Sequence, residues 1–168
     1  MPTVANEPQP VDPSWPRYSH HAFPSYRFIP GYSPHPRHNR AGHSHGQTTP
    51  EPIVLRPERW RHMESYLYAI DLYNYAYWWE CHESLESLWL AAGENTMQGN
   101  FFRALIQLTA SNLKRFVGYG QAADNLTSSG ITRLGRVSDF YMGIDVASLM
   151  NYLNNHRGEA APLIRLNG

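Results

Sequence analysis

The chain of 168 residues has little cysteine, no excess of charge and no long apolar run. Cys81 is its one cysteine, so no disulfide can form within the chain and a reducing, cytoplasmic setting is expected. The formal net charge is zero, which argues against a nucleic-acid or anionic-membrane partner. No apolar run approaches the roughly 20 residues of a membrane span. The N-terminus also lacks the residue order of a secretory signal. These absences favour a cytoplasmic globular protein with one domain.

Proline is almost missing after residue 57, since twelve of the thirteen prolines lie within the first 57 residues. Each proline removes a backbone N–H and restricts the residue before it, so helices cannot run through the early segment. Residues 1–16 are predicted to be a disordered tail. Residues 17–56 are rich in tyrosine, phenylalanine and histidine, which indicates an extended arm packed on the body. A helical domain is predicted for residues 57–168.

From Pro57 onward, apolar residues recur at helical spacing. The expected helices span about residues 57–75, 77–92, 97–117, 121–137 and 145–156. Gly93 is expected to end the second helix, Asp145 to begin the last, and Gly130 to interrupt the fourth. No alternation of apolar and polar residues predicts a strand. The fold class is therefore all-α, a multihelical bundle of about five helices with an extended N-terminal arm.

The segment from Tyr77 to Trp89, YWWECHESLESLW, concentrates the polar groups that can carry chemistry. On a helix with about 100° per residue, His82 and Glu86 lie one turn apart at the edge of an apolar arc, with Glu83 beside them. Glu80 falls on the side opposite that arc. Imidazole and carboxylate at a partly shielded surface suit a metal site or proton transfer. The alternative is a structural hydrogen-bond network between helices.

The arm carries six of the nine histidines. The spacings H-x-x-H, at His35 and His38, and H-x-H, at His43 and His45, could each give two imidazoles to one metal. The competing interpretation is that several of these side chains point to solvent. On the third helix, Gln107 and Lys114 line a polar edge that could face His82 and Glu86 across a helix pair.

Two helical motifs and one arm motif resemble a known family. The helical motifs are Trp79-Glu80-Cys81-His82-Glu83 with Glu86 and Trp89, and Leu105-Ile106-Gln107-Leu108 with Lys114. The arm reads Pro24-Ser25-Tyr26, Pro30-Gly31, Pro34-His35-Pro36 and Gly42-His43-Ser44. These residues resemble a longer branch of the domain-of-unknown-function 309 family over roughly residues 24–118. The resemblance implies a multihelical fold and no settled activity. Arg103-Ala104 stands where the family often has Q-G.

The predicted function is an enclosed polar pocket that binds a divalent transition metal or a small ligand, with metal-assisted hydrolysis the simplest reaction. The candidate catalytic residues are His82, Glu83 and Glu86. The candidate metal ligands are His82, Glu86, His35 and His43. The candidate ligand-binding residues are Gln107, Lys114, Tyr26 and Trp79.

A non-catalytic binding or scaffold module is the alternative function, in which the His/Glu cluster only fixes the helix register. The sequence contains no nucleophile elbow, phosphate-binding loop or dinucleotide fingerprint that would distinguish an enzyme from a scaffold module. The sequence leaves open whether a reaction is catalysed and whether the chain forms a homo-oligomer.

Overall fold

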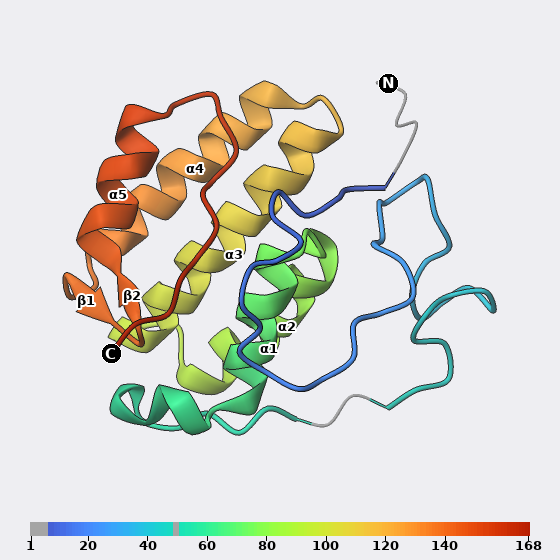
Figure 1. Cartoon of the computed structure of the whole chain (residues 1–168), viewed down its shortest axis with the longest axis horizontal. Helices are drawn as coiled ribbons and strands as arrows, with labels where there is room; N and C mark the ends of the chain where they lie inside the picture. Colours follow the sequence, from blue (N-terminus) through green and yellow to red (C-terminus); the bar gives the residue numbers. More distant parts are fainter. Residues whose placement is uncertain (1–6, 49–50) are drawn as a thin grey trace.

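The computed structural model describes residues 7–48 and 51–168 and is predominantly helical, as predicted (Figure 1). Residues 1–6 of the predicted tail lie outside the described part. The described residues form a short 3-10 helix followed by five α-helices: η1 Pro57–His62, α1 Glu64–Asn74, α2 Trp78–Ala92, α3 Met97–Phe116, α4 Gly120–Leu134 and α5 Val146–Asn155. None of these helices is long and apolar enough to cross a membrane. The prediction of an all-α bundle with an N-terminal extension is confirmed.

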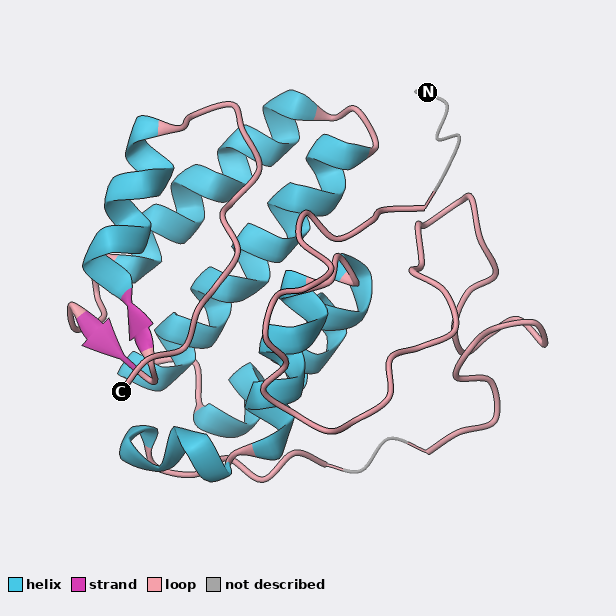
Figure 2. Cartoon of the chain, in the orientation of Figure 1, coloured by secondary structure: helices cyan, strands magenta, loops and turns pink. Residues whose placement is uncertain are grey.

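A small antiparallel hairpin corrects the expectation that the chain has no strand (Figure 2). Strand β1, Phe140–Tyr141, pairs with β2, Ile144–Asp145. Met142 and Gly143 make the turn, both with positive φ. Two residues per strand are too few to show the alternation by which a strand is recognised in a sequence.

The pair α2 and α3 forms because the loop between them carries both a stop and a start signal. Gly93 ends α2 with a φ of +91°, a conformation that favours glycine. Thr96 then caps α3 by accepting a hydrogen bond at Oγ1 from the Gly99 N–H at 2.8 Å. A loop this short turns the chain back, so α2 and α3 lie antiparallel. Asp145 caps α5 in the same way, accepting from the Ser148 N–H at 2.9 Å.

Gly130 does not interrupt α4, contrary to the sequence prediction. It is buried against α3, where an added Cβ would lie 3.1 Å from Leu108 Cδ2. The glycine therefore lets α4 approach α3 closely. Glycine has a low helix propensity, but the packing of α4 on α3 offsets this cost. Helices α2 and α3 share the core, in which Leu85, Phe102 and Ile106 are buried. Trp89 packs on the core from a partly buried position, and Trp78 and Leu113 are also only partly buried.

Two segments without regular structure lie over the helices (Figure 1). The C-terminal one is held by Asn74, whose amide donates to the Ile164 carbonyl at 2.8 Å and accepts from the Ile164 N–H at 2.7 Å. Trp15, near the end of the predicted tail, donates from Nε1 to the same carbonyl at 2.9 Å. The proposed boundaries at 16 and 56 stay predictions.

The start of the arm is fastened to α1 by the fully buried carboxylate of Asp71. This carboxylate accepts from Arg17 Nε at 2.8 Å, from the Tyr18 N–H at 2.8 Å, and from the N–H and Oγ of Ser19 at 2.9 and 2.7 Å. A buried carboxylate is stable only when donors replace the water it has lost. The buried carboxylate on α1 is therefore stable only while the arm is docked, and the same hydrogen bonds hold the arm in place.

We predict that Asp71→Ala lowers the free energy of unfolding by about 3 kcal/mol or more, because it leaves buried backbone donors unpaired. The matched control is Asp124→Ala, which breaks an ion pair with Arg115 of the same 2.8 Å length on a half-exposed side chain. That change should cost about 1 kcal/mol or less. Urea unfolding of both variants measures the difference. Equal losses of unfolding free energy would contradict the claim that burial makes the Asp71 contacts more stabilising than the exposed ion pair.

Candidate functional site

One turn of α2 brings together His82, Glu83 and Glu86. His82 Nδ1 lies 3.4 Å from Glu83 Oε1, and His82 Nε2 lies 3.7 Å from Glu86 Oε2. One ligand atom from each of the three residues lies within 4.8 Å of the others, which makes them a group able to hold a metal ion within the described residues. The three side chains are 33, 53 and 42% exposed, so a ligand can reach them from solvent.

The surroundings of Glu83 favour the ionised form of its carboxyl group. The hydrogen bond with His82 is the largest cause that lowers the pKa of Glu83, and burial opposes it. Electrostatic interactions with His82, Arg37 and His35 lower the pKa of Glu83 further. Arg37 and His35 belong to the arm, so the arm contributes to the electrostatic field at the cluster. The Nδ1 atom of His82 is buried, and its 3.4 Å contact with Glu83 Oε1 has poor hydrogen-bond geometry.

A second His/Glu pair joins the arm to α2 through Glu80. His43 Nε2 lies 2.7 Å from Glu80 Oε2, and the side chains are only 4 and 6% exposed. Burial, the largest cause, raises the pKa of Glu80, and the hydrogen bonds from His43 and the Phe28 N–H oppose that rise. The helical projection gives Glu80 no role, because it cannot show that the arm covers that side of the helix. The signal available in the sequence is the shared motif that contains both Glu80 and the G-H-S piece of the arm.

The other arm residues surround the first turn of α2. His35 and Phe28 contact the edge of the Trp79 indole, with ring centres 5.6 and 4.8 Å away. The His35 Nδ1 atom accepts from the backbone N–H groups of Arg37 and His38, so only its Nε2 is left for a ligand. Tyr26 packs against the His43 ring with centres 4.7 Å apart.

The candidate residues on α3, Gln107 and Lys114, have no direct contact with the cluster at His82 among the contacts described above. Gln107 Oε1 is buried and has no hydrogen-bond partner among the described residues. The register of the pair is fixed by Arg103, which lies over the Trp89 ring at 5.0 Å. Gln107, one turn further along α3, therefore faces the α2 turn that holds Glu86. Lys114 is exposed, and its ammonium lies 5.4 Å from the Tyr119 ring, away from this turn.

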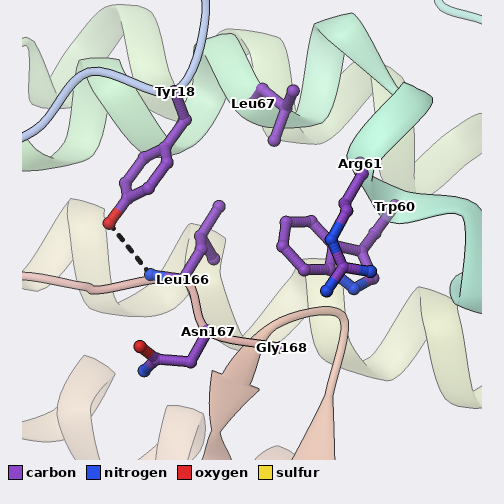
Figure 3. Close-up of a pocket in the computed structure, with 7 residues that line it drawn as sticks. All are labelled: Tyr18, Trp60, Arg61, Leu67, Leu166, Asn167 and Gly168. Atoms are coloured by element: carbon purple, nitrogen blue, oxygen red, sulfur yellow. Dashed lines mark hydrogen bonds between the residues drawn. The ribbon is translucent and has the colours of Figure 1, made fainter.

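The two best-defined cavities lie elsewhere in the molecule. One has a volume of about 320 Å³ between Tyr18, Trp60, Leu67 and the C-terminal segment (Figure 3). The other, of about 200 Å³, lies between α5 and the same segment. Neither is lined by a candidate site residue. An enclosed pocket at His82 therefore stays a prediction, and the observed cluster is open to solvent.

Comparison with known proteins supports the family resemblance. The model of a family described as a domain of unknown function, DUF309, matches residues 66–126. The matched stretch includes the cluster at His82, Glu80 and the α3 residues Gln107 and Lys114, while the arm lies outside it. The resemblance is thus confirmed over this stretch. No curated protein matches the chain.

We predict that His82→Gln raises the pKa of Glu83, because the hydrogen bond with His82 is the main cause of its lowering. A carboxyl group with a lowered pKa adds stability above the ordinary value near 4.5, and this stability is lost as the pH falls through the folded-state pKa. The variant should therefore lose less stability on acidification. Carboxyl carbon NMR measures the pKa directly, with His156→Gln on the distant α5 end as the control. An unchanged Glu83 titration would contradict the assignment.

Proposed function

We propose that His82, Glu83 and Glu86 bind one divalent transition metal and that the protein uses this site to bind a small ligand, with hydrolysis the simplest reaction. The observation that carries the proposal is the convergence of one imidazole and two carboxylates from a single helical turn. An imidazole–carboxylate set without a thiolate suits zinc, manganese or iron.

The geometry of the three groups fits one ion after a small movement. Ligand atoms about 2.0–2.2 Å from a zinc ion can be no more than about 4.4 Å apart. The ligand atoms are now up to 4.8 Å apart. They come within reach of one ion if side-chain rotations move each atom by less than about 1 Å, which half-exposed side chains can do. Only one ring nitrogen of His82 can serve such an ion, so the other is left to a carboxylate or water.

Three protein ligands leave at least one position for water or a ligand, as in catalytic zinc sites. A bound metal would supply an activated water for hydrolysis. Around it, His35 and Trp79 form one wall from the arm and α2, and Gln107 faces the site from α3. His43 is left out of the proposed ligand set, because both of its ring nitrogens are already bonded.

A scaffold role is the second candidate, and one observation favours it. The two nitrogens of His82 lie within ion-pair distance of Glu83 and Glu86, so a protonated imidazole could pair with both without a metal. The cluster would then stabilise the first half of α2 and have no ligand. The two functions differ in metal content and in what replacing His82 does to stability.

We predict that protein purified without a histidine tag binds one equivalent of Zn²⁺ or Mn²⁺ in isothermal titration. Glu86→Gln should weaken that binding at least about tenfold, since it removes a charged ligand. Glu94→Gln, an exposed change in the loop after α2, is the matched control and should bind as the unaltered protein does. Equal affinity in the Glu86 variant would exclude the proposed ligand set.

The stability of His82→Ala separates the two functions independently. In a structural network the change should cost about 1–3 kcal/mol, because the partners lose their hydrogen bonds. At a ligand site, whose residues are often held at a cost to stability, the change should leave the metal-free protein as stable or more stable. Thermal unfolding in the presence of a chelator measures this difference.

A further inference from the structure

Three side chains of the docked arm and α2 form a continuous hydrogen-bonded line that the metal proposal does not use. Ser44 Oγ lies 2.8 Å from His43 Nδ1. On the other side of the ring, His43 Nε2 lies 2.7 Å from Glu80 Oε2. The order is hydroxyl, imidazole, carboxylate, with both contacts at normal hydrogen-bond length.

The carboxylate decides which nitrogen carries the proton. An ionised Glu80 can only accept, so neutral His43 donates from Nε2 and keeps a lone pair on Nδ1. The Ser44 hydroxyl then donates to that lone pair. This is the arrangement by which an adjacent base activates a serine and a third group orients the base. Compared with the serine-protease triad, the two ring nitrogens have exchanged roles, which does not alter the proton transfer.

The base is held rigidly, as a catalytic base must be. Its side chain and that of Glu80 are buried, and Oε2 of Glu80 accepts a second bond from the Phe28 N–H at 3.0 Å. Tyr26 packs against the imidazole, and its hydroxyl accepts from the His43 N–H at 3.3 Å. The loop itself is compact at Gly42, where a Cβ would collide with the carbonyl oxygens of His35 and Pro36.

The nucleophile is placed at the surface end of this line. Ser44 is partly exposed, and its N–H is fixed by the Pro36 carbonyl at 2.9 Å. The next residues, His45 to Thr48, are exposed. A substrate, and then a water molecule, can therefore reach Ser44 and the adjacent Nδ1 of His43 from solvent, while Glu80 stays buried.

We propose that Ser44, His43 and Glu80 form a second active centre, in which Ser44 is the nucleophile in the hydrolysis of small carboxylic esters. The centre needs no metal and uses none of the proposed metal ligands.

The reaction balances with water as the only other reactant. Ser44 Oγ forms a bond to the ester carbonyl carbon while its proton passes to His43 Nδ1. The carbon–oxygen bond to the alcohol then breaks, and the alcohol leaves with that proton. A water molecule attacks the acyl group in the same manner, which releases the carboxylic acid and restores Ser44.

A cation is tied to the loop that holds the nucleophile. Arg37 donates from Nη1 to the Gln47 carbonyl at 3.1 Å, and the Gln47 N–H donates to the Ser44 carbonyl at 3.1 Å. The guanidinium is thus fastened to the turn that holds the nucleophile.

The test is covalent labelling with a fluorophosphonate, which reacts with activated serines, followed by peptide mass spectrometry, with EDTA present throughout. We expect the label on Ser44, loss of the label in Ser44→Ala, and labelling slowed at least about 100-fold in Glu80→Gln and His43→Gln. Hydrolysis of p-nitrophenyl acetate should fall in parallel. EDTA removes any metal, so this outcome does not depend on the site at His82.

Two matched variants test whether removing any hydroxyl or imidazole from the arm affects labelling. Ser33→Ala removes an arm hydroxyl that is bonded to backbone atoms of Ile29, and His38→Gln removes an exposed arm imidazole. Both should be labelled as the unaltered protein is. The absence of label on Ser44, or equal labelling after the change to His43, would overturn the proposal. Ser44→Ala and Glu80→Gln keep the size of the side chain nearly unchanged, and melting curves of both check that the fold is intact.

Discussion

A carboxylate enclosed by protein must be matched by N–H and O–H donors, and this requirement fixes the position of the arm. Asp71 on α1 and Glu80 on α2 are both buried. The arm supplies donors to both oxygens of Asp71, from Arg17 to Ser19, and to Oε2 of Glu80, from Phe28 and His43. Neither carboxylate has enough partners on its own helix. The arm is therefore part of the fold, and the two helices can bury acidic side chains because the arm lies over them.

The helices could be predicted from the sequence because their signals are local. Helical periodicity, the glycine after α2 and the caps Thr96 and Asp145 all act within about one turn. The path of the arm could not be predicted in this way, because it depends on pairs such as His43 and Glu80 that are 37 residues apart and share no period. The cluster at His82 was predictable from i, i+4 spacing. The burial of Glu80 was not, because a helical projection treats every face without apolar residues as solvent-exposed.

His82 and His43 stand beside glutamates in both cases, but their surroundings suit different chemistry. His82 is one-third exposed and lies 3.4 and 3.7 Å from its two carboxylates. These contacts are loose enough for an ion to enter between the groups. His43 is almost fully buried, with both nitrogens in bonds of 2.8 Å or less. There is no room for an ion there, while the short bonds are well suited to passing a proton.

Helix geometry keeps these two groups apart and leaves Glu83 between them. His82 follows Glu80 by two residues, or about 200° around the helix, whereas Glu83 returns to within about 60° of Glu80. Arg37 and His35 of the arm therefore also lower the pKa of Glu83, although His82 is the larger cause. A divalent ion would neutralise Glu83 and Glu86, and the arm would then leave a positive excess beside it. That balance favours an anionic group, such as a carboxylate, at the open position of the proposed metal site.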